Sequence, residues 1–356
     1  MMKMKKINIF FIALIGIVLL SCNEKFDITQ FQTEDPGNIA GDTIFIKLNP
    51  EWAGFNHPED IIVGREPLIY VADTDNDQIV MLNLDGQRLS SKSIKKPVAI
   101  AQDYRLNLIV CAQFDTLGQT FSAVYKIDLV ASNHNLETAP VKRILPQLSD
   151  LNKPDRKYTG AAVFYDNSYV IARTGPNNSN LIDPDNSLLR FVTKNNGTKD
   201  SLIGRVPLLD PNSTGIMSVN KVSSVKSFNK RNYDIVLNLV GDNSFKTQWL
   251  RYVTSQDFTG YENNLTPAAS DLMTPGFFVK PEGSEIDASG NIYVTESLRD
   301  SSYVYKFNSF GDKLIKFGGP SVFSEPYAVA YFDKILYVAD RGNNRILRFQ
   351  LSTDIQ

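Results

Sequence analysis

The sequence predicts an all-β fold, a six-bladed β-propeller, because one hairpin pattern returns along the chain. The stretch Leu336–Phe349, LYVADRGNNRILRF, has a near-copy at Ile69–Leu82, IYVADTDNDQIVML, and a looser version at Ile292–Phe307. Each stretch reads as an apolar strand, a polar turn and a second alternating strand, which is the pattern of a β-hairpin. A supersecondary unit that recurs in this way is typical of a repeat fold.

Six strands that each contain an apolar pair mark the units of the repeat. The pairs begin at residues 70, 109, 169, 235, 293 and 337, so successive units are 39, 60, 66, 58 and 44 residues apart. An apolar segment precedes each pair, an alternating segment follows it, and most units show a fourth strand. Four strands per unit and six units, with no long helical pattern, predict the propeller, and the long spacings predict insertions.

The last unit ends after its third strand, near Gln350. The segment 42–48, DTIFIKL, is a strand pattern with nothing before it to pair with. We expect this N-terminal strand to become the fourth strand of the last blade. Such a closure leaves no open blade edge and makes residues 42–356 the propeller domain.

Residues 1–21 predict a lipoprotein signal peptide. Lys3, Lys5 and Lys6 precede the apolar run Ile7–Leu20, which is too short to be read as a spanning helix and leads through Ser21 to Cys22. This end resembles a bacterial lipobox, which implies that Cys22 is lipidated, becomes the mature N-terminus and holds the protein on a membrane. Residues 22–41 have no clear period and predict a flexible tether between the lipid and the propeller.

Two of the hairpins point to a known family. Tyr337–Ile346 resembles the NHL repeat, and Tyr70–Ile79 is a close second. The whole chain is similar to the six-bladed, NHL-like lipoproteins of Bacteroidetes, many of which have no known function. The resemblance implies an outer-membrane lipoprotein, and the acids Glu24 and Asp27 behind Cys22 partly match the surface-export signal of that group. Exposure at the cell surface therefore stays open.

Charge and cysteine content argue against nucleic-acid binding and against a site built from paired cysteines. The formal net charge is −2, and loss of the three lysines of residues 1–21 makes it −2 − 3 = −5, so the domain offers no basic footprint for nucleic acid. The chain has two cysteines, Cys22 and Cys111. Cys111 lies in an apolar run and is expected to be a buried small hydrophobe, which leaves no pair for a disulfide or a thiolate metal site.

Two sets of polar residues are candidates for a binding site at the mouth of the propeller channel. One set ends the second strands, where an Asp is also expected to accept hydrogen bonds in the following turn. The other set stands just before the first strands and differs in chemistry from blade to blade. The candidates are His57, Lys96, Tyr158, Glu282 and Glu325 from the second set, Arg173, Asn238 and Glu296 from the first, and Arg341 from a nearby loop.

The residues favour a binding module over an enzyme. His57 and His134 are the only histidines and stand far apart in the sequence, and no G-x-S-x-G pattern occurs, so a His₃ zinc site and a serine nucleophile elbow are not predicted. We therefore expect a lipid-anchored propeller that presents one face to a glycan, a peptide or an outer-membrane protein partner, without a cofactor. The alternative is a calcium-dependent hydrolase or lyase at the channel mouth, with Glu282, Glu296, Asn238 and Asp340 as oxygen ligands.

Overall fold

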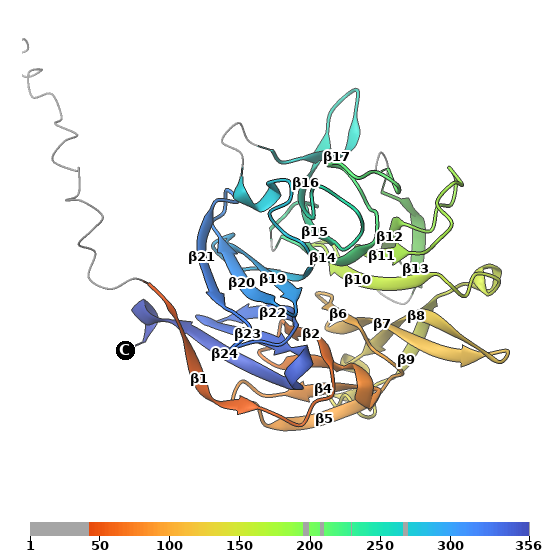
Figure 1. The fold of residues 1–356 in the computed structure, drawn as a ribbon. Helices are drawn as coiled ribbons and strands as arrows, with labels where there is room; N and C mark the ends of the chain where they lie inside the picture. The colour runs from red at the N-terminus through yellow and green to blue at the C-terminus, as the bar shows by residue number, and fades with distance from the viewer. Residues whose placement is uncertain (1–42, 195–198, 207–209, 229, 266–269, 356) are drawn as a thin grey trace, which may run out of the picture. The chain divides into compact units, whose positions relative to one another are not determined.

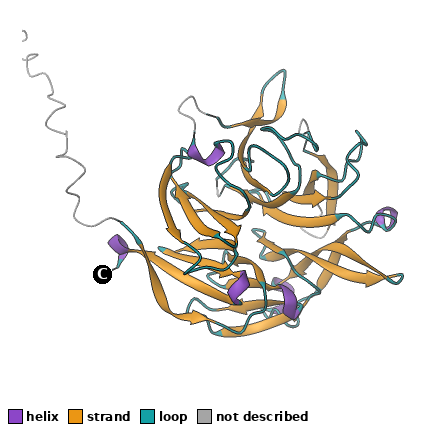
Figure 2. Ribbon diagram, in the orientation of Figure 1, coloured by secondary structure: helices purple, strands orange, loops and turns teal. Residues whose placement is uncertain are grey.

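The protein forms six four-stranded antiparallel sheets arranged as the blades of a propeller (Figures 1 and 2). The structure is a computed structural model, and it describes residues 43–194, 199–206, 210–228, 230–265 and 270–355. The helical segments among the described residues are all short 3₁₀ turns. The predicted signal peptide, Cys22 and the tether lie outside the described residues. Within the described part of the chain, no helix has the length and apolarity needed to span a membrane.

Blades 1 to 3 follow one another along the chain, and each is built from four consecutive strands. Blade 1 contains β2 (Pro58–Val63), β3 (Ile69–Asp73), β4 (Gln78–Leu82) and β5 (Arg88–Ser93). Blade 2 contains β6 (Ala99–Gln102), β7 (Asn107–Thr116), β8 (Gln119–Asp128) and β9 (Val141–Leu145). Blade 3 contains β10 (Lys157–Val163), β11 (Tyr169–Thr174), β12 (Ser187–Lys194) and β13 (Lys199–Arg205).

Blades 4 and 5 repeat this plan, whereas blade 6 takes its outer strand from the front of the domain. Blade 4 contains β14 (Val222–Ser227), β15 (Ile235–Leu239), β16 (Thr247–Thr254) and β17 (Thr259–Asn263). Blade 5 contains β18 (Pro281–Ile286), β19 (Ile292–Leu298), β20 (Ser301–Phe307) and β21 (Lys313–Gly318). Blade 6 contains β22 (Pro326–Phe332), β23 (Ile335–Asp340), β24 (Arg345–Leu351) and β1 (Phe45–Trp52).

The N-terminal strand β1 pairs antiparallel with β24, and Figure 1 shows the two strands side by side. Phe45 stands opposite Leu351, and Leu48 stands opposite Arg348. The strand is displaced toward higher residue numbers from the expected segment 42–48, and it ends at Trp52, which is buried against Tyr337 with ring centroids 5.6 Å apart. Both ends of the domain therefore meet in one sheet.

The apolar pairs that marked the repeat are explained by the packing between blades. Each second strand is covered on both faces, so two successive side chains are buried on opposite sides. Tyr70, for example, belongs to the cluster between blades 1 and 2, and Val71 to the cluster between blades 6 and 1. The described residues contain six such apolar clusters, one between each pair of neighbouring blades. Cys111 is buried in one of them.

The direction of the strands decides which loops share a face. In an antiparallel blade, the segment that leads into the first strand and the turn between the second and third strands lie at the same end. We call this end the mouth face. His57, before β2, and the 3₁₀ turn Thr74–Asn76, after β3, both lie there, and the backbone N–H of Asp75 donates to the backbone carbonyl of Asn56 over 3.0 Å.

Candidate functional site

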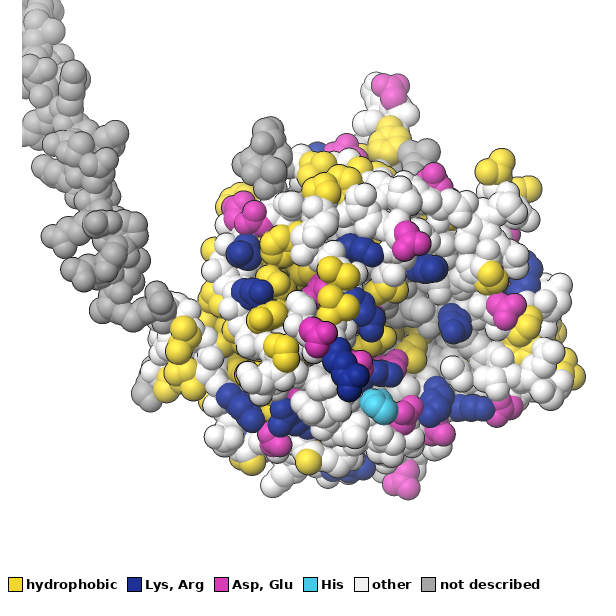
Figure 3. Space-filling model, viewed as in Figure 1, with side chains coloured by type: hydrophobic (Ala, Val, Ile, Leu, Met, Phe, Trp, Pro, Cys, Tyr) yellow, Lys and Arg dark blue, Asp and Glu magenta, His cyan; other side chains and the backbone are white. Residues whose placement is uncertain are grey.

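A channel lined by the six first strands runs through the centre of the ring. Its volume is about 590 Å³, which falls within the range of small-molecule sites. Glu59, Glu282 and Tyr327 line it near the mouth face, because they stand at the starts of β2, β18 and β22. Arg65 and Asp333 line the opposite end. On the face seen in Figure 3, basic and acidic side chains lie side by side near the centre of the ring, next to a histidine.

Bulges near the starts of the first strands aim side chains at this channel. In five of the six blades the register between the first and second strands shifts at this point. A bulge adds a residue and redirects its side chain. The added residues are Glu59, Thr159, Ser223, Glu282 with Gly283, and Tyr327. The first strand of blade 2, β6, has no such shift.

The bulge residues divide into two groups by what they contact. In blades 3 and 4 they hold the ring together, because Thr159 Oγ1 donates to Val222 O over 2.6 Å and Ser223 Oγ donates to Pro281 O over 3.0 Å. In blades 1, 5 and 6 they are the ionisable residues Glu59, Glu282 and Tyr327. These three side chains therefore give the mouth its chemistry on one side of the ring.

Three charged side chains complete this group, which we call the mouth cluster: Glu59, Lys280, Glu282, Glu325, Tyr327 and Arg341. Arg341 joins two carboxylates, with Nε 3.1 Å from Glu59 Oε1 and Nη1 2.8 Å from Glu325 Oε2. Its guanidinium also lies over the Tyr327 ring, 5.2 Å from the centroid. Lys280 Nζ is 3.2 Å from Glu282 Oε1. The cluster thus spans the blades 5, 6 and 1.

Burial sets the protonation of the two bulge glutamates. Desolvation raises the pKa of Glu282 to about 7, against the opposing effect of Lys280. Desolvation also raises the pKa of Glu59, against the opposing effect of Arg341. Glu282 and Tyr327 lie close enough that each shifts the pKa of the other. The mouth therefore contains a carboxyl that exchanges its proton near neutral pH.

His57 and Lys96 extend the mouth toward blade 2. Both contact Asp75, with His57 Nδ1 2.5 Å from Oδ2 and Lys96 Nζ 3.0 Å from Oδ1. The hydrogen bond from Lys96, and then that from His57, lowers the pKa of the Asp75 carboxyl. His57, Lys96 and Glu325 all have positive φ, of 49°, 45° and 54°, and each stands just before a proline that begins a first strand or leads into it.

Of the residues predicted before the first strands, four lie on the mouth and one does not. His57, Lys96, Glu282 and Glu325 lie there, although Glu282 stands inside β18 rather than before it, because that strand begins at Pro281. Tyr158 lies inside β10, is 2% exposed and packs in the core between blades 2 and 3. Its backbone N donates to Ser122 Oγ over 2.9 Å.

The residues that end the second strands are engaged in structural hydrogen bonds. Asp73 Oδ1 accepts from Asn56 N over 2.7 Å, and Asp340 Oδ1 accepts from Ser324 N over 2.7 Å. Glu296 Oε1 accepts from the backbone N of Val279 and Lys280. Each acid thus ties the end of a second strand to the segment that leads into the first strand of its own blade.

Arg173 and Asn238, the other predicted residues of this set, are also turned inward. Arg173 is 3% exposed and donates to Asp183 Oδ1 and Pro184 O, both over 2.7 Å, so it shapes the insertion after β11. Asn238 is fully buried and donates through Nδ2 to Ser224 Oγ over 2.9 Å. Neither side chain is placed to meet a ligand in the mouth.

The oxygens expected to bind calcium do not converge. Asn238, Glu282, Glu296 and Asp340 belong to three different blades, and all but Glu282 hold the structural contacts described above. Among the described residues, no group of three or more His, Cys, Asp or Glu side chains could hold a metal ion. The predicted ligand set therefore does not fit calcium.

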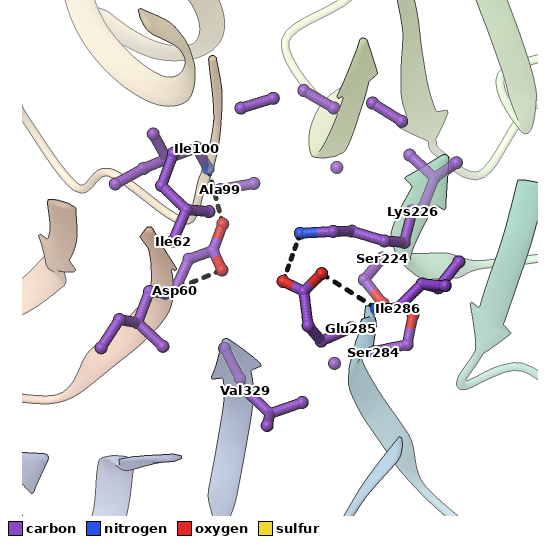
Figure 4. A pocket seen from close by; sticks show the side chains of 18 of the residues that line it. Asp60, Ile62, Ala99, Ile100, Ser224, Lys226, Ser284, Glu285, Ile286 and Val329 are labelled. Atoms are coloured by element: carbon purple, nitrogen blue, oxygen red, sulfur yellow. Dashed lines mark hydrogen bonds and ion pairs between the residues drawn. The ribbon is translucent and has the colours of Figure 1, made fainter. Parts of the chain in front are cut away.

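A second polar layer lies deeper in the channel, where Asp60, Lys226 and Glu285 face its centre (Figure 4). We call these three residues the mid-channel triad. Lys226 Nζ is 2.7 Å from Glu285 Oε2, and Glu285 Oε1 accepts from Ile286 N over 2.9 Å. Asp60 accepts from the backbone N of Ile61 over 2.8 Å and of Ile100 over 2.6 Å. Burial raises the pKa of Asp60 to about 6.

The sequence analysis missed Glu59 and Tyr327 at the mouth and the whole triad. One signal was present, because Pro58, Pro281 and Pro326 each precede a bulge residue of the mouth. Proline has no N–H to donate and is suited to the first position of a strand. The residue that follows such a proline was therefore a better marker of the mouth than the residue before it.

Comparisons with solved structures support the fold. No protein-family model and no curated protein sequence matches the chain. A calcium-binding protein, regucalcin, from Agrobacterium tumefaciens superposes with a TM-score of 0.57 at 12% identity, over 86% of this chain and 94% of that one. A gluconolactonase from Xanthomonas campestris superposes with a TM-score of 0.53 at 11% identity, over 88% and 98%.

A structure from the Bacteroidetes group gives a similar result. A protein of unknown function from Bacteroides thetaiotaomicron superposes with a TM-score of 0.53 at 15% identity, over 88% of this chain and 73% of that one. The chain thus has the six-bladed fold that these binding proteins and enzymes share. At such identities the likeness concerns the fold alone, and the site must be argued from its own residues.

Proposed function

We propose that the protein is a lipid-anchored extracytoplasmic binding propeller that takes a small polar ligand, such as a sugar, into the mouth of its channel. The observation that carries this proposal is the convergence of Glu59, Glu282 and Tyr327 above a channel of about 590 Å³. Their carboxyl and hydroxyl groups, with the cations Lys280 and Arg341, offer both donors and acceptors to a hydroxyl-rich ligand. The membrane anchor rests on the predicted lipidation of Cys22.

Among the ligand classes expected from the sequence, the geometry favours a small glycan or the end of a chain. The mouth cluster lies at the top of a channel, so that a ligand enters end-on rather than lying across a flat surface. Two of the structural neighbours described by their activity, gluconolactonase and an aldose sugar dehydrogenase, act on sugars by name. A large protein partner would instead use the outer loops of the face.

Ligand binding tests the proposal directly. Soluble protein, residues 43–356, would be screened by thermal shift against monosaccharides, oligosaccharides and short peptides, each with calcium and with chelator. A ligand at about 100 times its dissociation constant stabilises the folded state by about 2.7 kcal/mol. We expect the shift to vanish in Tyr327→Phe and Glu282→Gln and to persist in Glu137→Gln, an exposed control. A shift that survives both mouth substitutions would place the ligand elsewhere.

A second function is favoured by one observation, the pKa of about 7 of Glu282. A carboxyl that exchanges its proton near neutral pH can serve as a general acid or base in a hydrolase or lyase. Because the predicted calcium ligands do not converge, this alternative uses the Glu282 carboxyl itself as the proton-transfer group. It predicts turnover of a sugar lactone or glycoside with a pH midpoint near 7 that is lost in Glu282→Gln. Binding without turnover by the same panel would leave the binding module.

A further inference from the structure

The channel is acidic, and Asp60, the carboxyl at its middle, forms no ion pair with the described residues. Its lining contains six acidic residues, Glu59, Asp60, Glu282, Glu285, Asp287 and Asp333, and two basic ones, Arg65 and Lys226. Arg341, Lys280 and Lys226 pair with Glu59, Glu282 and Glu285 respectively. Asp287 is hydrogen-bonded within its own turn, for example to Asn291 Nδ2 over 2.8 Å. Asp60 contacts two backbone N–H groups, and the described residues give it no ion pair.

A charge taken out of water requires a partner, or its protonation changes. Lys226 on β14 and Glu285 on β18 are the charged groups that act on Asp60 across the channel, in opposite directions. On the side of blade 2, Asp60 accepts a hydrogen bond from the Ile100 N–H on β6. The buried Cys111 thiol on β7 lies close enough for Asp60 to act on it, and burial raises the pKa of this thiol. The mid-channel triad therefore carries two carboxyls for one ammonium.

A second, independent feature indicates that this layer receives a ligand. Ser284 lines the channel and is 8% exposed, and its buried Oγ forms no hydrogen bond within the described chain. Figure 4 draws Ser284 with Ser224 on the side of the channel formed by blades 4 and 5, across from Asp60. A buried hydroxyl without a partner loses hydrogen-bond energy that a ligand group can restore.

The part of the channel wall formed by blades 2 and 3 carries small, apolar residues. Ala99 and Ala101 of β6 and Gly160 and Ala161 of β10 line the channel there. This wall leaves room for the carbon skeleton of a ligand while its polar group faces the triad. A compact molecule with one cationic head and a short body fits both halves of the lining.

We propose that the channel binds a small ligand that bears a primary ammonium group, and that this group pairs with Asp60 in the mid-channel layer. The inference rests on the proposed binding function and adds the chemical class of the ligand. The ammonium supplies the cation that Asp60 lacks, and its remaining N–H groups can donate to Ser284 Oγ. Neutral and anionic analogues of the same shape leave Asp60 unpaired and bind more weakly.

Matched probes test the ammonium group. Isothermal titration of the soluble domain at pH 7.5 would compare glucosamine with N-acetylglucosamine and glucose, and 1,4-diaminobutane with 1,4-butanediol. We expect each amine to bind at least about 10-fold more tightly than its neutral analogue, as one charge-assisted hydrogen bond provides. The amine affinity should fall as the pH is lowered through about 6, the pKa of Asp60, because the carboxyl then becomes neutral.

Two substitutions with opposite effects separate this role from a structural one. Asp60→Asn should weaken amine binding at least about 10-fold. Asn has one acceptor oxygen and cannot replace both backbone contacts of Asp60, so Lys226→Met is the second variant. It removes the internal ammonium that competes for the carboxyls, so amine binding should become tighter. Glu137→Gln is the control that should change neither value.

The outcomes are distinguishable. Equal binding of amines and neutral analogues, lost in Glu282→Gln, would overturn the ammonium inference and leave the proposed function in place. Calcium or magnesium binding that depends on Asp60, without amine binding, would overturn it in favour of a metal. Looser amine binding in Lys226→Met would also contradict it. Absence of binding by every probe and every sugar of the panel would overturn both proposals.

Discussion

The substitution Glu282→Gln is expected to make the protein more stable while it damages the candidate site. Glu282 is 5% exposed, and burial raises its pKa from 4.5 to about 7. A carboxyl with a raised folded-state pKa holds its proton longer in the folded chain than in the unfolded chain. Its ionisation therefore opposes folding, and the stability that it removes grows as the pH rises from 4.5 to 7.

The magnitude follows from the shift itself. Each pKa unit corresponds to about 1.4 kcal/mol, so the ionised Glu282 costs the folded state about 3 kcal/mol at pH 8. At pH 5 the Glu282 carboxyl is largely ionised in the unfolded chain and still protonated in the folded chain. The pH is only slightly above the unfolded pKa, so the loss of stability is about 1 kcal/mol. Glutamine has nearly the same shape and no charge, so the variant should gain these amounts.

Urea unfolding at pH 5 and pH 8, followed by tryptophan fluorescence, measures the difference. The free energy of unfolding of Glu282→Gln should exceed that of the unsubstituted domain, and the gap should widen with pH. Glu137→Gln, which changes an exposed glutamate, should show no such gap. A variant that is equally stable at pH 8, or a gap that does not depend on pH, would refute the reasoning that the desolvation of Glu282 outweighs its pairing with Lys280.

Three further predictions concern the frame that holds the site. Gly283→Ala should reduce ligand binding and stability together, because a Cβ at this position would lie 2.5 Å from Tyr327 O; unchanged binding in titration would contradict the tight approach of β18 to β22. Asp340→Ala should destabilise the fold by about 3 kcal/mol in urea unfolding, since Ser324 N and Arg345 Nε lose a buried carboxylate acceptor; a loss below about 1 kcal/mol would contradict this role. Deletion of residues 43–52 should cause aggregation in light scattering, because it opens the edge of β24; a monomeric, equally stable product would show that β1 is dispensable.

The sequence was sufficient for the fold because the repeat has a physical cause that is visible in single residues. Each second strand is sandwiched between two blades, so pairs such as Tyr70–Val71 are apolar on both faces and stand out from the alternating strands around them. The count of six blades follows from six such pairs. The exact start of β18 at Pro281, by contrast, is not visible in the hydrophobic pattern, because a bulge interrupts the period of two there.

The candidate site was harder to predict because bulges interrupt the first strands. A bulge changes which way a side chain points without leaving a mark in the hydrophobic pattern. Glu59 and Tyr327 therefore looked like ordinary strand residues, and Tyr158, which is buried, looked like a mouth residue. The triad of Asp60, Lys226 and Glu285 joins strands far apart in the sequence, so only the closed ring brings it together.

The two kinds of acid near the mouth can be told apart by what they contact. Asp73, Glu296 and Asp340 each accept a hydrogen bond from the backbone of the segment that precedes a first strand, and this contact stabilises the blade. The side chains of Glu59 and Glu282 contact charged side chains of the mouth instead, with Arg341 and Lys280 as their partners. Folding explains the first kind. It does not explain a carboxyl that lowers stability at neutral pH, and a ligand that meets this carboxyl in the mouth does.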